Sequence, residues 1–330
     1  MGKWKVYVSR TLPGNALARL AEECDLELNR EDRVVSKEEI KGKVNGKDAL
    51  LCLLTDKIDA EVLDAAGEQL KVVSNYAVGF DNIDVKAATE RGIPITNTPG
   101  VLTEAVAEHT FALLLSLARR IPESDKFVRA GKYKGWAPEM FLGKQLEGKT
   151  LGIIGLGRIG FKVAEYAAKG MGMKVAYNDL KPNTEFEKEF NAKYLEREEL
   201  LKQSDFVSLH VPLLPSTKHL IGEKELGLMK PSACLINTAR GPIIDEKALV
   251  TALQNKKIRG AALDVYENEP ELTQGLAELN NTVLTPHTAS ATEETRSAMA
   301  ELAVDNLLAV LTGNLPKSLV NKEVWEKRRK

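Results

Sequence analysis

Short apolar runs alternate with amphipathic stretches through the first part of the chain. The expected elements are strands at 5–8, 49–53, 70–74 and 93–96, and helices at 15–23 and from Asp59 onward. Asp59 has the N-cap position before the apolar residues of its helix, and Gly67 stands where that helix would end. This alternation of strands and helices predicts a mostly parallel sheet that is covered by helices.

A second series of strands begins after residue 149. It follows a long apolar helix at 104–119 and a stretch with several glycines that predicts a connector. The expected strands are 150–154, 175–177, 206–210, 234–237, 260–264 and 282–284. Six strands in this order predict a doubly wound sheet. A last helix is expected at 293–311, and the tail at 315–320 is expected to return to the first domain.

Composition and charge limit the classes of protein. The chain has 330 residues and a formal net charge of −1, which is enough material for two domains of ordinary size. Charges of both signs are interspersed, so no basic surface for nucleic acid is predicted. No apolar run reaches the length of a membrane span. The basic run at 327–330 is expected to be a solvated end.

Three cysteines, Cys24, Cys52 and Cys234, lie far apart and near no cluster of histidines, so no metal site is predicted. They are expected to be buried in a reducing compartment. The first residues pass directly into a strand pattern without the apolar core of a signal peptide. We therefore expect a cytoplasmic protein.

The clearest chemical signal is Gly155-Leu156-Gly157-Arg158-Ile159-Gly160, between an apolar strand and a helical run at 161–168. The first glycine permits a tight turn, the second lets the backbone approach a pyrophosphate, and the third allows the helix to pack closely on the strand. N–H groups at the start of the helix would hold the phosphate charge. A glycine-rich turn without a ligand is the alternative, but the strand before it and the helix after it favour a dinucleotide site.

A strand at 174–177 is followed by Asn178-Asp179, where dinucleotide folds place an acidic group on the adenosine ribose. A carboxylate there accepts hydrogen bonds from ribose hydroxyls and repels a 2'-phosphate, so NAD is expected to be preferred over NADP. Lys181 could weaken this preference. In the alternative interpretation, Asp179 is a surface residue that caps a loop.

Three polar residues, Arg240, Glu269 and His287, follow later strands of the same sheet. Open α/β sheets bind ligands at the carboxyl ends of their strands, and a guanidinium there suits bidentate capture of a carboxylate. Taken singly, they could be a surface salt-bridge partner, a solvated loop charge and a packing histidine. Their recurrence beside a dinucleotide loop favours a catalytic site. Of the other histidines, His210 is expected to line the cofactor cleft, and His109 is expected to cap or pack within its helix.

Several long motifs stand at residues 75–84 (NYAVGFDNID), 97–103 (NTPGVLT), 152–160, 237–241 (NTARG), 264–270 (DVYENEP) and 285–287 (TPH). With these motifs the chain resembles the D-isomer-specific 2-hydroxyacid dehydrogenase family, and within it the glyoxylate and hydroxypyruvate reductases. The resemblance implies a two-domain α/β fold. A Rossmann-type, doubly wound cofactor domain would span 100–287, and a smaller flavodoxin-like substrate domain would combine 1–99 with 288–330.

The resemblance also implies roles for individual residues. Arg240 would bind the substrate, His287 would be the acid–base group, and Glu269 would hold its imidazole. The backbone N–H groups of Val78 and Gly79 would bind the substrate carboxylate. The cofactor contacts would be Gly155, Gly157, Arg158, Ile159 and Gly160 at the pyrophosphate, Asp179 at the ribose, His210, Thr238 and Ala239 in the cleft, and Asp264 at the nicotinamide carboxamide.

Together these features predict an NAD-dependent dehydrogenase that interconverts a small 2-keto acid, such as glyoxylate or hydroxypyruvate, and its D-2-hydroxy acid. Members of the family form dimers through the connector helix and the loop after it, so a homodimer is expected. Two alternatives stay open. One is an NAD(H)-sensing binding protein of the corepressor type, and the other is a family enzyme for phosphoglycerate or phosphite.

Two departures from the relatives concern specificity. In the loop at 136–143, many of the reductases carry a second tryptophan, and this chain has Met140 at that place. The preference for hydroxypyruvate is therefore open. Relatives that use NADP carry a serine-arginine pair where this chain has Asp179-Leu180.

Overall fold

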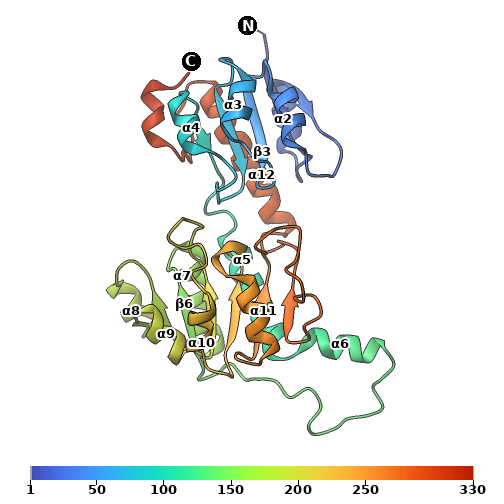
Figure 1. Ribbon diagram of the computed structural model, residues 1–330. Coiled ribbons are helices and arrows are strands. Elements are labelled where there is room, and N and C mark those ends of the chain that lie inside the picture. Colours follow the sequence, from blue (N-terminus) through green and yellow to red (C-terminus); the bar gives the residue numbers. More distant parts are fainter. Residues whose placement is uncertain (1, 330) are drawn as a thin grey trace. The chain divides into compact units, whose positions relative to one another are not determined.

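The computed structural model describes residues 2–329 and divides the chain into two compact units (Figure 1). Unit 1 comprises Met1–Leu102 and Ala291–Lys330, and unit 2 comprises Thr103–Ser290. Each unit is built around one parallel β-sheet. The predicted two-domain α/β fold is therefore confirmed. Within residues 2–329, no helix combines the length and the apolar character that a membrane crossing requires.

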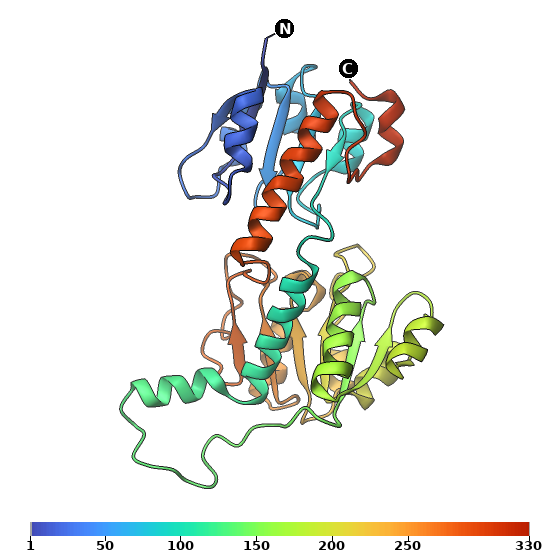
Figure 2. The ribbon, with the colours of Figure 1, turned by 180° about the vertical axis from the view of Figure 1, so that it is seen from behind.

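Unit 1 contains a five-stranded parallel sheet in the order β2-β1-β3-β4-β5. The strands are β1 (Trp4–Val8), β2 (Cys24–Leu28), β3 (Ala49–Leu53), β4 (Val72–Tyr76) and β5 (Ile95–Thr96), and the helices are α1 (Ala16–Glu23), α2 (Lys37–Val44), α3 (Ala60–Ala66), α4 (Val85–Glu90) and α12 (Glu293–Leu311). This strand order is flavodoxin-like, as predicted. Figure 2 shows α12 along one face of the sheet, where the Ser74 hydroxyl donates a hydrogen bond to the Ala303 carbonyl at 2.9 Å.

The elements with strong local end signals agree with the prediction. The Asp59 side chain caps α3 by accepting a hydrogen bond from the Val62 N–H at 3.3 Å, and the helix ends at Gly67 with a φ of 73°. The last helix has the predicted bounds. The tail also returns to this sheet, because the Val320 N–H donates to the Ile95 carbonyl at 2.8 Å.

Four elements of unit 1 are absent from the prediction: β2, α2, α4 and a 3-10 helix at Lys322–Lys327. β2 is an edge strand in which charged and apolar residues alternate and only Cys24 is buried, so its apolar signal is weak. The prediction of a solvated basic end was wrong for Arg329. Its guanidinium donates to the Gly67 carbonyl at 2.6 Å and its N–H donates to the Gly92 carbonyl at 3.0 Å. Lys330 lies outside the described residues.

Unit 2 contains a seven-stranded parallel sheet in the order β12-β11-β10-β9-β6-β7-β8. The strands are β6 (Thr150–Ile154), β7 (Lys174–Asn178), β8 (Lys193–Tyr194), β9 (Phe206–Leu209), β10 (Cys234–Asn237), β11 (Gly260–Leu263) and β12 (Thr282–Leu284). The chain builds from β6 to β8 in one direction and then from β9 to β12 in the other. The ends of β6 and β9 therefore flank the switch point, where doubly wound sheets bind ligands. The doubly wound sheet is confirmed, with the short β8 added to the six predicted strands.

Helices cover both faces of the unit 2 sheet. The first face carries α5 (Thr103–Ala118), α7 (Arg158–Glu165) and α8 (Thr184–Phe190), and the second carries α9 (Arg197–Gln203), α10 (Glu223–Leu228) and α11 (Glu246–Gln254). Figure 2 shows α5 and α7 side by side in front of the strands. Ile153 packs in the first apolar layer and Ile154 in the second, as the alternation of side chains along a strand requires.

The expected connector contains a helix that was not predicted, α6 (Ile121–Arg129). None of its residues is buried. In Figures 1 and 2, α6 and the loop after it extend away from the sheet of unit 2, and the chain returns to the sheet before β6, where Leu146 is buried. We call residues 121–143 the arm.

Candidate active site

The glycine-rich loop joins the carboxyl end of β6 to α7. Gly155 has a φ of 96°, and a Cβ there would lie 2.8 Å from backbone atoms of His210. A Cβ on Gly160 would lie 2.1 Å from the carbonyl oxygen of Gly155. Around Gly157, by contrast, a Cβ would have no described atom within 4 Å apart from chain neighbours. Packing therefore requires the first and third glycines, whereas the second borders open space of the kind a pyrophosphate needs.

Helix α7 begins at Arg158, three residues before the predicted start, and Gly157 is its N-cap. Arg158 and Ile159 therefore belong to the first helical turn. The N–H groups of a first turn have no acceptor within their own helix, so they are available to an anionic ligand. After α7 the chain continues as a π-helix at Tyr166–Gly170.

Asp179 follows β7, the neighbour of β6 in the sheet. Its Oδ2 accepts a hydrogen bond from the Leu156 N–H at 2.6 Å, and its Oδ1 accepts one from the Leu180 N–H at 2.6 Å. The carboxylate thus caps its own loop, as the alternative interpretation holds. It does so directly beside the glycine-rich loop, as the ribose interpretation requires.

Arg240 follows β10 and is positioned by its neighbours. The Asn237 side chain accepts a hydrogen bond from the Ala239 N–H at 3.0 Å and donates one to the Arg240 carbonyl at 2.9 Å. A Cβ on Gly241 would lie 1.9 Å from the backbone of Tyr266. Only glycine permits this approach, which packs the turn after Arg240 onto the segment that follows β11.

Glu269 and His287 lie together at the ends of β11 and β12. The Oε2 atom of Glu269 is 3.0 Å from Nδ1 of His287, and its Oε1 accepts a hydrogen bond from the Tyr266 N–H at 3.0 Å. Desolvation raises the pKa of Glu269, but the hydrogen bond and charge of His287, the Tyr266 N–H and the charge of Arg240 outweigh it, and the pKa lies below its usual value. The carboxylate is therefore ionised at neutral pH and accepts the Nδ1 proton, which leaves Nε2 for chemistry.

Asp264 organises the segment that carries His287. Its buried carboxylate accepts hydrogen bonds from the Thr285 hydroxyl at 2.6 Å, the Thr288 N–H at 2.8 Å and the Ala289 N–H at 2.8 Å. Its carbonyl accepts a hydrogen bond from the His287 N–H at 2.8 Å. His287 has a φ of 53°, in the left-handed region that side chains rarely adopt. The surrounding hydrogen bonds hold it there.

A histidine from α5 completes this arrangement. Nε2 of His109 lies 3.3 Å from Oδ1 of Asp264 and 3.2 Å from the Thr285 hydroxyl. Desolvation raises the pKa of Asp264, but its hydrogen bonds with His109, Thr285 and the two backbone N–H groups outweigh it and lower the pKa. His109 thus packs across from its helix to the loop before His287, rather than only within its helix.

The remaining predicted cofactor residues of unit 2 lie at the same edge of the sheet. His210 follows β9, and its Nε2 is 2.8 Å from the Ser208 hydroxyl. Desolvation lowers the pKa of His210 to about 3, so its ring is neutral. Thr238 and Ala239 follow β10, and the Thr238 hydroxyl lies 2.9 Å from that of Thr110 in α5.

Val78 and Gly79 belong to unit 1, where they follow β4. The Asn97 side chain donates a hydrogen bond to the Val78 carbonyl at 2.7 Å, and the Asn75 side chain donates one to the Gly79 carbonyl at 2.9 Å. Within the described part of the chain, the N–H groups of Val78 and Gly79 donate no hydrogen bond. They are therefore available to an anion.

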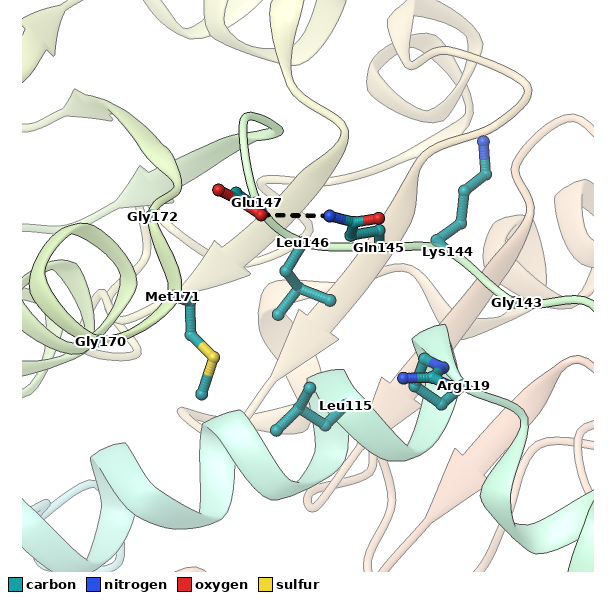
Figure 3. A pocket seen from close by; sticks show the side chains of 10 residues that line it. All are labelled: Leu115, Arg119, Gly143, Lys144, Gln145, Leu146, Glu147, Gly170, Met171 and Gly172. Carbon is teal, nitrogen blue, oxygen red and sulfur yellow. Dashed lines mark hydrogen bonds between the residues drawn. The ribbon is translucent and has the colours of Figure 1, made fainter.

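A separate cavity of about 700 Å³ lies at the other end of the unit 2 sheet (Figure 3). Its walls are Leu115 of α5, Arg119 directly after that helix, and the segments 143–147 and 170–172. These two segments precede β6 and β7, whereas the glycine-rich loop follows β6. The cavity contains none of the predicted site residues.

The positioning residues Asn75, Asn97, Asn237 and Gly241 are missing from the predicted site. All four stand inside the motifs that carry the family resemblance. Motif membership was therefore the available signal, but their hydrogen-bond partners and close contacts depend on the folded backbone. No group of three or more His, Cys, Asp or Glu side chains within residues 2–329 is placed to hold a metal ion.

Comparison with known proteins agrees with this geometry. The family model described as "D-isomer specific 2-hydroxyacid dehydrogenase, NAD binding domain" matches residues 111–289. The glyoxylate reductase of Thermococcus litoralis is 51% identical over 326 residues, 98% of each chain. A crystal structure of a Thermus thermophilus protein has a TM-score of 0.90 at 47% identity, over 96% of this chain and 99% of that one. An NADPH-dependent glyoxylate/hydroxypyruvate reductase from Sinorhizobium meliloti, in complex with NADP and malonate, has a TM-score of 0.86 at 33% identity, over 100% of this chain and 99% of that one. The chain therefore belongs to the D-isomer-specific 2-hydroxyacid dehydrogenase family.

Proposed function

We propose that the protein is an NADH-dependent reductase of small 2-keto acids, with glyoxylate and hydroxypyruvate as candidate substrates and D-2-hydroxy acids as products. The observation that carries this proposal is the ionised Glu269 at 3.0 Å from His287, at the strand ends that also carry Arg240. The name of the Thermococcus litoralis relative supports glyoxylate. In this proposal unit 2 is the cofactor domain and unit 1 is the substrate domain.

The three catalytic side chains have different tasks. Arg240 binds the keto acid and stabilises the negative charge that develops on the carbonyl oxygen during reduction. Bound NADH supplies the hydride that C2 receives. Protonated His287 donates the Nε2 proton to the oxygen, and Glu269 stabilises the imidazolium and fixes the ring. In the oxidation of a hydroxy acid, neutral His287 accepts the hydroxyl proton instead. The N–H groups of Val78 and Gly79 bind the substrate carboxylate.

The residues around the glycine-rich loop fit a dinucleotide. The first turn of α7, with Arg158 and Ile159, receives the pyrophosphate beside Gly157, and the carboxylate of Asp179 receives the adenosine ribose. Because this carboxylate repels a 2'-phosphate, NADH is preferred over NADPH. By the family resemblance, His210, Thr238, Ala239 and Asp264 line the nicotinamide half of the cofactor.

The arm is the proposed contact between two copies of the chain. Five of its apolar side chains are exposed to solvent: Ile121 53%, Val128 58%, Tyr133 50%, Trp136 80% and Leu142 62%. Exposed apolar side chains gathered on one extension are typical of a protein interface. A homodimer buries them. In sedimentation experiments the parent protein should be a dimer. The double variant Trp136→Ser, Leu142→Ser should contain a larger fraction of monomer.

A cytoplasmic location is consistent with the cysteines. Cys24, Cys52 and Cys234 are buried and free. Burial raises the pKa of Cys24 to about 11 and that of Cys234 to about 12. These thiols are therefore protonated at neutral pH, as expected for packing residues in a reducing compartment.

The proposed activity is tested with a panel of 2-keto acids and loss of nicotinamide absorbance, with NADH and NADPH in parallel. The expected result is turnover of glyoxylate or hydroxypyruvate with NADH, and its near loss in His287→Ala. NADH binding without turnover of any 2-keto acid would favour the nucleotide-sensing alternative. Met140→Trp in the same panel reports whether this position changes the ratio of hydroxypyruvate to glyoxylate reduction.

A further inference from the structure

The backbone amides assigned to the substrate carboxylate are held by a second loop of unit 1. Val78 and Gly79 follow β4, and Asn97-Thr98 follows β5, its parallel neighbour. The Asn97 side chain donates to the Val78 carbonyl at 2.7 Å, and the Thr98 N–H donates to the Ala77 carbonyl at 2.8 Å. Two consecutive carbonyls are thus bound by two consecutive residues.

This pairing fixes the direction of the N–H groups. In a trans peptide, the carbonyl of one residue and the N–H of the next lie in one plane and point in opposite directions. Since the carbonyls of Ala77 and Val78 face the Asn97-Thr98 loop, the N–H groups of Val78 and Gly79 point away from that loop. Two successive N–H groups that point the same way can both donate to one anion.

The C-terminal part of unit 1 orients Asn97 in turn. Asn97 is 8% exposed, and its Oδ1 accepts a hydrogen bond from the Ser318 hydroxyl. Asn306 of α12 donates to the Asn97 carbonyl at 3.1 Å and accepts from the Ser318 N–H at 3.2 Å. A carbonyl only accepts, so the Asn97 group that faces Val78 is its NH2, and the Ser318 hydroxyl stabilises this orientation of the amide.

We propose that Asn97 is a positioning residue for the substrate carboxylate and that Ser318, in the tail after α12, sets the orientation of its amide. This inference rests on the proposed function, because it takes the N–H groups of Val78 and Gly79 as the carboxylate site. Its ligand is the carboxylate of a small 2-keto acid. If either side chain is removed, the N–H groups of Val78 and Gly79 remain, but their direction is no longer fixed. The affinity for substrate therefore falls, while proton and hydride transfer continue.

Three variants test the role of Ser318 with the best keto acid of the panel. Ser318→Ala should raise KM roughly three- to tenfold, the effect of one net hydrogen bond, with kcat within about twofold of the parent. Ser318→Thr keeps the hydroxyl and should restore KM. The matched control is Thr89→Val, which removes a bond of the same kind to the tail, from Asn321 Nδ2 to the Thr89 hydroxyl at 2.9 Å. KM should be unchanged in this control.

A double-mutant cycle tests whether Ser318 acts through Asn97. Asn97→Ala should raise KM at least as much as Ser318→Ala does, and adding Ser318→Ala to it should change KM no further. The dissociation constant of NADH should be the same in all variants. An unchanged KM in Ser318→Ala, additive effects in the cycle, or a loss confined to kcat would overturn the positioning role while the proposed function stood. Absence of turnover in the parent protein would overturn the proposed function itself.

Discussion

The carboxylate of Glu269 lies 3.0 Å from Nδ1 of His287, and the two residues follow the neighbouring strands β11 and β12. A second carboxylate–imidazole pair stands close by in sequence, where Glu267 lies 2.6 Å from Nε2 of His219. The charge of Arg240 is among the causes that lower the pKa of Glu269. The two pairs therefore offer a test and a matched control.

Glu269→Gln should move the pH range of keto-acid reduction. The parent carboxylate stays ionised below its usual range, because its pKa is lowered, and its charge favours the imidazolium that donates the proton. Without that charge, the pH above which keto-acid reduction declines should be lower than in the parent. As a result, kcat at neutral pH should fall roughly tenfold or more. Glu267→Gln should keep the parent profile. Identical kcat profiles for Glu269→Gln and the parent, with chemistry rate-limiting, would contradict the role of the pair.

Asp264→Asn should reduce both stability and turnover. The pKa of Asp264 is below its usual value of 3.8, so its ionisation stabilises the fold above that pH, and this contribution is lost as pH falls through the folded-state pKa. In addition, the NH2 group of the substituted amide faces a backbone N–H, that of Thr288 or Ala289, which is itself a donor. Thermal unfolding at neutral pH should show a loss of about 2 kcal/mol or more, decreasing below about pH 4.

The control for Asp264→Asn is Asp205→Asn. Asp205 accepts a hydrogen bond from the Thr150 N–H at 3.0 Å, at the amino end of the same sheet, and its pKa is also lowered. Asp205→Asn should lower the free energy of unfolding. Its kcat should be unchanged at temperatures at which the variant is folded. A parent-like kcat in Asp264→Asn would show that the His287 segment does not need this carboxylate.

Two glycine substitutions should separate ligand binding from packing. Gly157→Ala places a methyl group in open space, so the free energy of unfolding should change little, whereas NADH should bind roughly tenfold or more weakly because the methyl group occupies the pyrophosphate side of the loop. Gly160→Ala drives a methyl group against the Gly155 carbonyl and should lower Tm markedly. Fluorescence titration with NADH and thermal unfolding measure the two effects. Parent-like NADH affinity in Gly157→Ala would place the pyrophosphate elsewhere.

Asp179→Ser combined with Leu180→Arg should narrow or reverse the preference for NADH. The Leu180 side chain is fully exposed, so an arginine fits there without displacing a neighbour. The substitution removes the carboxylate that repels a 2'-phosphate and adds a guanidinium that binds one. The ratio of kcat/KM for NADH and NADPH is the measurement, with Leu180→Arg alone as control. A parent that prefers NADPH would contradict the role given to Asp179.

The sequence predicted those elements and site residues whose signals are local. The caps of α3, the bounds of α12 and the glycine-rich loop each depend on residues that are close together in the chain. The edge strand β2 and the exposed helix α6 were missed because neither buries a regular apolar stripe. The partners of Asn97 could not be predicted, because Val78 and Ser318 reach it from distant parts of the chain.

The division of unit 1 between the two ends of the chain has a consequence for synthesis on the ribosome. Unit 2 is contiguous from Thr103 to Ser290, so its core can close before the last segment is translated. The sheet of unit 1 is translated first, but it is complete only after α12 covers its face and Ser318 binds Asn97. A nascent chain stalled after Ser290 would therefore hold a complete nucleotide domain and an unfinished carboxylate loop. On the proposed assignment, the carboxylate site of unit 1 is therefore completed later in synthesis than the nucleotide site of unit 2.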